Sequence, residues 1–243
     1  MATSATHYKA QLGPVYSWML GDLDAAFARA AAEVDDLPLP AARGTAVDLG
    51  AGLGLHALSL AKRGFDVVAV DNCQVLLDEL QSRGKSLAIA IHNADLEEFR
   101  RFLPNPAQVI VCMGDTLTHL PALSTVESLL GTVAASLAPG GVFATTFRDY
   151  ATFELQGDRR FILVRADADR IMTCFLEYGD HQVTVHDLLQ EKEDGRWRQS
   201  ISSYPKLRLA PEWVTSKLSE LGFSVKRDST PGGMVRLVAT KMT

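Results

Sequence analysis

The feature that most constrains this chain is a glycine-rich run, Val47-Asp-Leu-Gly-Ala-Gly-Leu-Gly54, set between a short apolar segment and an amphipathic one. Glycines at 50 and 52 let the backbone turn sharply and let a ligand approach where a Cβ would collide. A later apolar run ends in Asp71, where a carboxylate can accept hydrogen bonds from both hydroxyls of a ribose. The pattern predicts a crevice that binds a nucleoside.

The spacing of the glycines indicates which class of nucleoside ligand the crevice would bind. A dinucleotide fingerprint G-x-G-x-x-G would need glycine at position 55, but that residue is Leu55. The third glycine is Gly54, and an acid, Asp48, precedes the first. This arrangement suits a pyrophosphate poorly, so it favours a cofactor without phosphates and disfavours a nicotinamide dehydrogenase.

Short apolar runs alternate with amphipathic segments through the middle of the chain. The strands predicted from this rhythm are Thr45–Leu49, Asp66–Asp71, Ser86–Ile91, Gln108–Cys112 and Val142–Phe147. The segments predicted to be helical are Leu53–Arg63, Gln74–Arg83, Glu97–Phe102 and Leu123–Leu137. Strict alternation of strand and helix predicts a parallel sheet with helices on both faces.

The two flanks of this region follow other patterns. Apolar residues at helical spacing predict one helix over Val15–Val34, which stops before the Pro38-Leu-Pro40 break. This helix belongs to an expected N-terminal lid of residues 1–43. Residues 151–209 predict an antiparallel β insert with strands Phe161–Val164, Ile171–Tyr178, Gln182–Leu189 and Trp197–Tyr204. A helix Pro211–Leu221 and two strands, Phe223–Lys226 and Val235–Thr240, complete the expected order.

Composition excludes several classes of function. The 243 residues, 47% of them hydrophobic, suffice for one large domain with a small annex. A net charge of −5 without a basic patch argues against a nucleic-acid or anionic-membrane partner. Scattered cysteines at 73, 112 and 174 and the lack of a long apolar run favour a cytoplasmic protein with reduced thiols.

In their order, the motifs resemble those of class I S-adenosylmethionine-dependent methyltransferases. The motifs are the glycine run, Asp71, Asn93-Ala-Asp95-Leu96 and Val111-Cys-Met-Gly114. The resemblance covers about residues 16–240. It implies that residues 1–243 form a single methyltransferase domain of the α/β class. Its Rossmann-like seven-stranded sheet would be mostly parallel, with an antiparallel final strand, the N-terminal lid helix, and the β insert after strand five.

The resemblance also implies which residues bind S-adenosylmethionine. Gly50, Ala51 and Gly52 would lie against its methionine part, and Asp48 would orient the glycine loop or the amino group. The other residues implied for the cofactor are Asp71 and Asn72 at the ribose, Asp95 and Leu96 at the adenine, Met113 and Gly114 beside the sulfonium, and Trp18. Asp71 and Asp95 have an alternative role, because aspartate is a good helix N-cap.

A narrower resemblance, to glycine and sarcosine N-methyltransferases, lies in Trp18-Met-Leu-Gly-Asp22 and in Gly114-Asp-Thr-Leu-Thr-His-Leu120. In that branch an asparagine usually occupies the position of Asp115, so the charge of the substrate stays open. An amine or phenol must lose a proton, which makes Asp115 and His119 the candidate catalytic bases. The alternative for His119 is a packed or capping histidine.

Substrate contacts are expected from the lid and from the insert, which follows strand five. Ring faces attract a sulfonium, which favours Tyr16, Trp18 and Tyr178. The polar candidates of the insert and its flanks are Arg148, Arg160, Tyr178, His181, His186, Ser203, Tyr204 and Lys206, and from these and the lid we select Tyr16, Arg148, Tyr178 and Lys206 as substrate-binding. No metal is expected, because His181, His186 and Asp187 lack a third convincing ligand.

These observations predict an enzyme that transfers a methyl group from S-adenosylmethionine to nitrogen or oxygen of a small molecule, by in-line displacement in a closed cleft. One alternative is cyclisation of the cofactor to a cyclic amino acid and methylthioadenosine. Another is a cofactor-binding module without turnover. The sequence leaves open whether the chain forms a homodimer.

Overall fold

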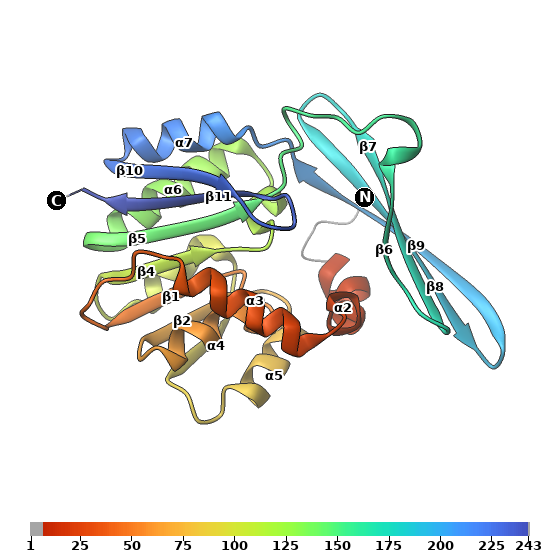
Figure 1. The fold of residues 1–243 in the computed structure, drawn as a ribbon, viewed down its shortest axis with the longest axis horizontal. Helices are drawn as coiled ribbons and strands as arrows, with labels where there is room; N and C mark the ends of the chain where they lie inside the picture. The colour runs from red at the N-terminus through yellow and green to blue at the C-terminus, as the bar shows by residue number, and fades with distance from the viewer. Residues whose placement is uncertain (1–6, 243) are drawn as a thin grey trace.

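A computed structural model describes residues 7–242 as an α/β domain joined to a separate antiparallel sheet (Figure 1). The larger domain contains a seven-stranded sheet in the order β10-β11-β5-β4-β1-β2-β3. Its strands are β1 (Thr45–Leu49), β2 (Asp66–Asp71), β3 (Ile89–Asn93), β4 (Ala107–Cys112), β5 (Leu137–Phe147), β10 (Phe223–Ser229) and β11 (Val235–Lys241). Only β11 runs antiparallel to its neighbours β5 and β10, as the sequence predicts.

The strand order places the ligand crevice. Both β2 and β4 pair with β1 in parallel, so the chain winds outward in opposite directions from β1 and β4. In open parallel sheets, ligands bind beyond the carboxyl ends of the strands at such a reversal. The glycine run follows β1 directly, so it lies at this point.

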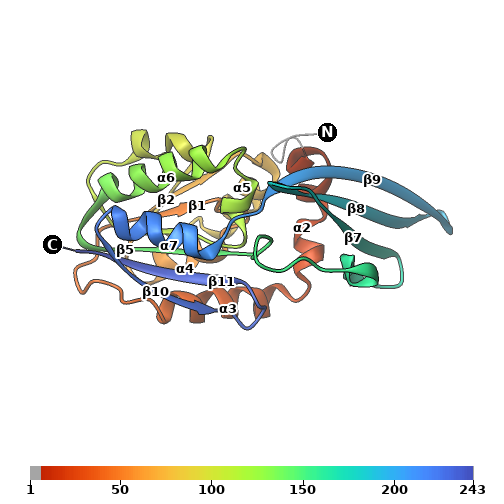
Figure 2. The same ribbon diagram turned by 90° about the horizontal axis from the view of Figure 1, so that it is seen from above.

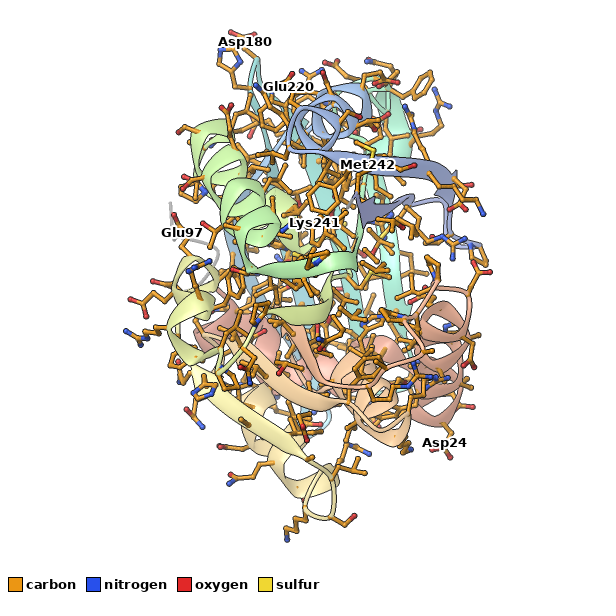
Figure 3. The ribbon with its side chains drawn as sticks, turned by 90° about the vertical axis from the view of Figure 1, so that its left-hand side faces the viewer. Asp24, Glu97, Asp180, Glu220, Lys241 and Met242 are labelled. Carbon is orange, nitrogen blue, oxygen red and sulfur yellow. The ribbon has the colours of Figure 1, made fainter. Side chains whose placement is uncertain are left out.

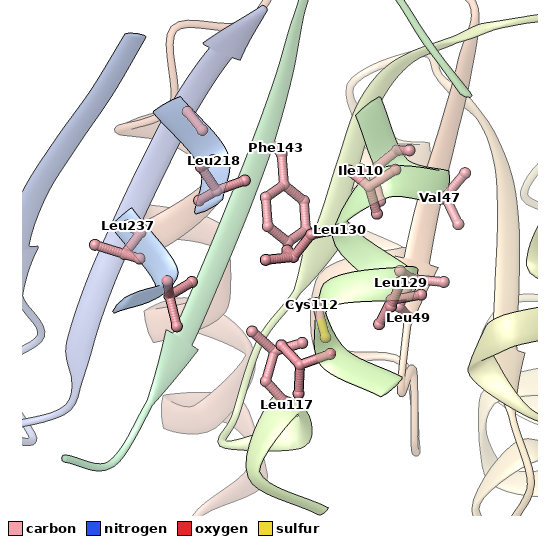
Figure 4. Close-up of a cluster of buried hydrophobic side chains, with 14 of the residues drawn as sticks. Val47, Leu49, Ile110, Cys112, Leu117, Leu129, Leu130, Phe143, Leu218 and Leu237 are labelled. Atoms are coloured by element: carbon pink, nitrogen blue, oxygen red, sulfur yellow. The ribbon is translucent and has the colours of Figure 1, made fainter. Parts of the chain in front are cut away.

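Helices cover both faces of the sheet, because alternate residues of each buried strand point to opposite sides. On one face, Val47, Leu49, Ile110 and Phe143 pack against α6 (Leu123–Ser136), α7 (Pro211–Glu220) and the short helix η2 (Leu96–Phe102), as Figure 4 shows in part. On the other face, Ala46, Val67 and Val109 pack against α3 (Leu23–Asp35), α4 (Leu55–Lys62) and α5 (Gln74–Arg83).

The N-terminal region corrects one prediction. The single helix expected over Val15–Val34 is two helices, α2 (Gly13–Leu20) and α3, preceded by the short helix η1 (Tyr8–Leu12). Gly21 adopts a φ of 79° and ends α2, and the carboxylate of Asp22 caps α3 by accepting from the N–H of Ala25 at 3.1 Å. As a result α3 packs on the sheet domain, while η1 and α2 face the insert.

The insert is a four-stranded antiparallel sheet in the order β6-β7-β8-β9. Its strands are β6 (Phe161–Ala166), β7 (Arg170–Tyr178), β8 (Gln182–Glu193) and β9 (Arg196–Leu207), with a short helix η4 (Gly157–Arg160) before them. Met172 and Leu176 of β7 pack with Val183 and Val185 against Leu12 and Val15 of the N-terminal helices. Figure 2 shows this sheet curving away from the α/β domain beyond α2. The face of β7 with Met172 and Leu176 is therefore the inner face.

Several strands extend beyond their predicted ends, and one is shifted. The third strand, expected at Ser86–Ile91, spans Ile89–Asn93, because the N–H of Leu87 bonds the carbonyl of Gly84 at 2.9 Å and holds a turn before it. Strands β8 and β9 run to a two-residue turn in which Asp194 and Gly195 both have positive φ.

The surface is rich in charge, and Figure 3 shows Asp24, Asp180 and Glu220 at the periphery with their side chains turned outward. Across residues 7–242, none of the helices combines the length and apolarity needed to span a bilayer.

Replacing Phe143 tests the core of the sheet domain. Its ring is fully buried between β5 and the α6–α7 layer, so Phe143→Ala should lower the free energy of unfolding by about 3–5 kcal/mol in urea denaturation. The matched control is Phe153→Ala, because that ring is 74% exposed and its loss should change stability by less than about 0.5 kcal/mol. Equal effects at both positions would contradict this packing.

Candidate functional site

A cavity of about 560 Å³ opens at the carboxyl ends of β1, β2 and β4. That volume lies in the usual range for a cofactor or drug-sized ligand. Four parts of the chain line it: the glycine loop, the ends of β2 to β4 with the loops after them, the N-terminal helices, and the insert. The lining residues are Tyr8, Tyr16, Gly50, Ala51, Gly52, Leu53, Leu55, His56, Asp71, Asn72, Leu76, Asp95, Leu96, Glu97, Met113, Gly114, Thr116, His119, Leu120, Pro121, Gln182 and Pro205.

The glycine loop is held by β2. The N–H groups of Gly50 and Ala51 donate to the carbonyl of Val70 at 2.8 and 3.1 Å. Gly50 has a φ of 75°, and a Cβ there would lie 2.6 Å from the side chain of Thr116, so glycine is required at this position. The loop therefore passes close to the residues that follow β4.

Asp71 joins the loop to the end of β2. Its carboxylate accepts from the N–H of Gly52 at 2.9 Å and from the N–H of Cys73 at 2.8 Å. Burial raises the pKa of Asp71, while these backbone donors oppose that rise. The carboxylate also lines the cavity, and the N-cap residue of α5 is Cys73, so the capping role considered from sequence does not apply to Asp71.

The other residues predicted to bind the cofactor lie on two sides of the cavity. Asn72 donates to the carboxylate of Asp95 at 3.2 Å, which brings the ends of β2 and β3 together beside Leu96. Asp95 precedes η2 but makes no side-chain cap there. On the other side, the N–H of Gly114 donates to the hydroxyl of Thr146 at 2.8 Å and fixes the loop after β4 next to Met113.

Aromatic and polar side chains form the end of the cavity nearest the insert. The rings of Tyr8 and Tyr16 lie 6.1 Å apart, and Tyr8 meets His119 edge to face at 5.3 Å. Burial raises the pKa of Tyr16 to about 12, with further contributions from Asp71 and Asp115, so its hydroxyl stays protonated at neutral pH. Gln182 of β8 completes this end of the lining.

His119 is held by stacking. Its ring is nearly parallel to that of Tyr204 at 5.6 Å, and His7 also stacks on Tyr204, at 4.1 Å. The Nδ1 atom of His119 is buried and has no hydrogen-bond partner among residues 7–242. Burial, together with the nearby charge of Lys206, lowers the pKa of His119 to about 3. The imidazole is therefore neutral at physiological pH.

Asp115 lies behind His119, in an ion pair that joins the two sheets. Its carboxylate accepts from Lys206 Nζ at 2.5 Å and from the N–H of Arg148 at 2.8 Å, with the Tyr150 hydroxyl at 3.5 Å. Burial alone would raise the pKa of Asp115, but Lys206 and His119 outweigh it, and the pKa lies below the usual range. Both oxygens are engaged, and neither Asp115 nor Lys206 lines the cavity.

Four other predicted site residues lie outside the lining. Asp48 is buried below the glycine loop, where burial raises its pKa to about 6. The Nε1 atom of Trp18 donates to Asp167 at 2.5 Å, so that ring anchors α2 to the turn between β6 and β7. The hydroxyl of Tyr178 accepts from the N–H of Leu155 at 3.3 Å, and the side chain of Arg148 is exposed.

The structure also adds residues to the site that the sequence reasoning missed. Tyr8 lies eight residues before Tyr16, roughly two helical turns. This spacing could have indicated that the two tyrosines lie on the same side of the N-terminal helices. Gln182 and Pro205 carried no such signal, because their place depends on how the insert folds back. The other additions are Leu53, Leu55, His56, Leu76, Glu97, Thr116, Leu120 and Pro121.

The histidines of the insert make contacts with protein groups. Asp187 accepts from Nε2 of His7 at 2.9 Å, and His186 contacts Glu177 and Ser203. Within residues 7–242, no three His, Cys, Asp or Glu side chains are grouped so that they could hold a metal ion.

Comparison with known proteins identifies the domain. The protein-family model described as "Methyltransferase domain" matches residues 46–141, which run from β1 into β5 and include the glycine loop, Asp71 and Gly114. This match covers less than half of the chain, and over it the chain is similar to class I methyltransferases. In this domain the seven-stranded sheet and the β insert after β5 agree with the fold expected from sequence.

A curated relative and two solved structures extend this result. The glycine/sarcosine/dimethylglycine N-methyltransferase of Actinopolyspora halophila is 30% identical over 109 residues, which are 44% of this chain and 19% of that protein. Streptomyces venezuelae DesVI superposes with a TM-score of 0.78 at 18% identity, over 96% of this chain and 100% of its own. The amino pentose methyltransferase CalS10 of Micromonospora echinaspora, solved with bound S-adenosylmethionine, gives a TM-score of 0.71 at 18% identity, over 98% and 97%.

These matches differ in what they cover. The aligned segment spans about a fifth of the Actinopolyspora relative and less than half of this chain, so the similarity covers only part of each protein. The solved structures cover nearly all of this chain at low identity, so they establish the fold, including the insert.

Removing Lys206 tests the buried ion pair. Lys206→Met leaves Asp115 buried without its cation, which should cost about 3–5 kcal/mol of unfolding free energy at pH 7. A carboxylate with a lowered pKa stabilises the fold above its unfolded pKa, and that contribution disappears as pH falls through the folded pKa. The difference between wild type and variant should therefore shrink at acidic pH in chemical denaturation.

The matched control is Lys226→Met, because its side chain is 75% exposed and lies 3.8 Å from Asp228. That variant should lose less than about 1 kcal/mol. A Lys206 variant as stable as the control at pH 7 would contradict the structural role of the pair.

Proposed function

We propose that this protein transfers the methyl group of S-adenosylmethionine to a nitrogen or oxygen atom of a small-molecule acceptor. The observation that carries the proposal is a single cavity that runs from Asp71, at the end of β2, to Tyr8, Tyr16 and His119 beneath the insert. One part of it suits a nucleoside cofactor and the other leaves room for an acceptor.

The cofactor end fits S-adenosylmethionine. Asp71 is fixed by two backbone donors and still lines the cavity, as a ribose ligand requires. Asp95 can accept from an adenine amino group, and Leu96 can pack against the base. Met113 and Gly114 would line the methionine side, together with the loop of Gly50, Ala51 and Gly52. When bound, this cofactor supplies an electrophilic methyl group on a sulfonium.

The chain's own contribution is positioning, because methyl transfer is an in-line displacement that needs orientation and exclusion of water. Tyr8 and Tyr16 present protonated hydroxyls and ring faces at the acceptor end, and ring faces favour a cationic sulfonium. Trp18 has a positioning role, since it fastens α2, which carries Tyr16, to the insert. Arg148, Tyr178 and Lys206 support the insert end of the cavity from outside the lining.

His119 is proposed to act on the acceptor by hydrogen bonding. Its imidazole is neutral at pH 7 and lines the cavity, so it can accept a hydrogen bond from the acceptor N–H or O–H and orient the attacking lone pair, and the proton leaves to solvent because a pKa of about 3 does not retain it. Asp115 has both oxygens occupied by Lys206 and Arg148 N–H, so its proposed role is to position the loop that carries His119.

The names of the relatives support a nitrogen acceptor. The Actinopolyspora relative is an N-methyltransferase of glycine, sarcosine and dimethylglycine, and CalS10 is an amino pentose methyltransferase. Both act on small molecules that carry an amine.

The first test is cofactor binding. Asp71→Ala removes the proposed ribose ligand and two loop contacts, so it should weaken binding of S-adenosylmethionine by about tenfold to a hundredfold in calorimetry. Asp78→Ala is the control, because Asp78 is exposed on α5 and bonds only Gln74 among the described contacts. Unchanged binding by the Asp71 variant would remove the ribose assignment.

The second test concerns His119. His119→Ala should lower the methylation rate about a hundredfold or more while S-adenosylmethionine binding changes little, because the imidazole acts on the acceptor. Since its pKa is about 3, protonation of His119 should not produce an acid limb in the rate between pH 5 and 8. An acid limb near pH 6.5 that disappears in the variant would contradict the neutral imidazole.

The same assay separates the alternative chemistries. Incubation with S-adenosylmethionine alone would yield methylthioadenosine from a cyclase, whereas a methyltransferase forms S-adenosylhomocysteine only when an acceptor is present. A binding module would retain the cofactor unchanged with every acceptor.

A further inference from the structure

Among the described side chains that line the cavity, the acidic ones outnumber the lysines and arginines. Three of the residues that line it are carboxylic acids, Asp71, Asp95 and Glu97, and among the described lining residues none is lysine or arginine. The negative field extends to the acceptor end, because Asp71 and Asp115 both contribute to raising the pKa of Tyr8 and Tyr16 there. An anion bound at that end would face these carboxylates.

Of the basic side chains described near the acceptor end, Lys206, Arg208, Arg165 and Arg170 each have a partner, and Arg148 is exposed. Lys206 is buried and bonded to Asp115. Arg208 bonds Glu154 at 2.7 Å and the carbonyl of Gly179 at 2.7 Å. Arg165 and Arg170 lie over the ring of Trp18, outside the lining. None of the paired cations can turn to a ligand without leaving a partner.

The cofactor and the possible acceptors differ in net charge when they react. S-adenosylmethionine has a sulfonium, an ammonium and a carboxylate, so its net charge is positive and suits this lining. An α-amino acid can attack only after its ammonium loses a proton, and it then has a net negative charge. An amine without a carboxylate is neutral in its reactive form and meets no such repulsion.

Resting on the proposed function, we propose that the acceptor is an amine that carries no carboxylate or phosphate beside the accepting nitrogen, a class that includes neutral amino sugars and amino alcohols. Its ring or chain lies between Tyr8, Tyr16 and Gln182, and its N–H meets His119. Free glycine and sarcosine, the substrates named for the Actinopolyspora relative, fall outside the class.

The location of the matched segment agrees with this distinction. The family match ends at residue 141, before the insert, and begins after the N-terminal helices. Tyr8, Tyr16, Gln182 and Pro205, which form much of the acceptor end, all lie outside it. The matched segment therefore covers the cofactor end and His119, and leaves out the other side chains of the acceptor end.

The test measures formation of S-adenosylhomocysteine with probes that differ in charge. The probes are serinol against serine, N-methylethanolamine against sarcosine, and methyl 3-amino-3-deoxyglucoside against glycine. We expect turnover only with the members that lack a carboxylate, at rates at least about tenfold above their partners, the effect of roughly one unfavourable charge contact. Equal or faster turnover of serine, sarcosine or glycine would overturn the proposal, as would turnover of no probe at all.

A variant that adds a positive charge provides the second experiment. Gln182→Arg places a cation at the acceptor end and should raise the rate with serine relative to serinol by about tenfold. Gln199→Arg is the control, because Gln199 is exposed on β9 and bonds Gln190 away from the cavity. An unchanged serine-to-serinol ratio in the Gln182 variant would count against the charge argument. Loss of S-adenosylmethionine binding in wild type would instead refute the proposed function, so the two failures are distinguishable.

Discussion

The buried ion pair between Asp115 and Lys206 is the interaction on which the rest of this site depends. It joins the loop after β4 to the last strand of the insert across 91 residues of sequence, and it lies directly behind His119. A buried pair of this kind adds little net stability, but loss of either member leaves an uncompensated charge. The pair therefore fixes one arrangement of the two sheets. That arrangement makes the cavity continuous from the cofactor end to the acceptor end.

The same pair gives different roles to Asp115 and His119, which the sequence alone could not distinguish. Asp115 and His119 are both candidate bases when only their order is known. In the fold, Lys206 and a backbone N–H occupy Asp115, while the positive charge and burial keep His119 neutral. Asp115 is thereby suited to holding a loop in place, and His119 to accepting a hydrogen bond from the acceptor. Neither role follows from residue type alone.

A comparable division applies to the two ends of the cavity. The cofactor end is built from loops that directly follow strands β1, β2, β3 and β4, so each of its residues is placed by local chain order. The acceptor end is assembled from η1, α2, η3 (Thr116–His119) and the insert, which are distant in sequence. The family match, residues 46–141, covers the cofactor end and η3 and leaves out η1, α2 and the insert.

The sequence by itself determined the alternation of strands and helices, the turn at Gly50 and Gly52, and the acid at the end of β2, because these are set by local periodicity and by backbone conformations that few residues adopt. It also located the insert. Only the tertiary structure decided that Trp18 anchors a helix, that Asp115 is paired, and that Tyr8 and Gln182 reach the cavity. These outcomes depend on contacts between segments far apart in the chain. A local sequence pattern does not encode which distant segment a side chain will contact.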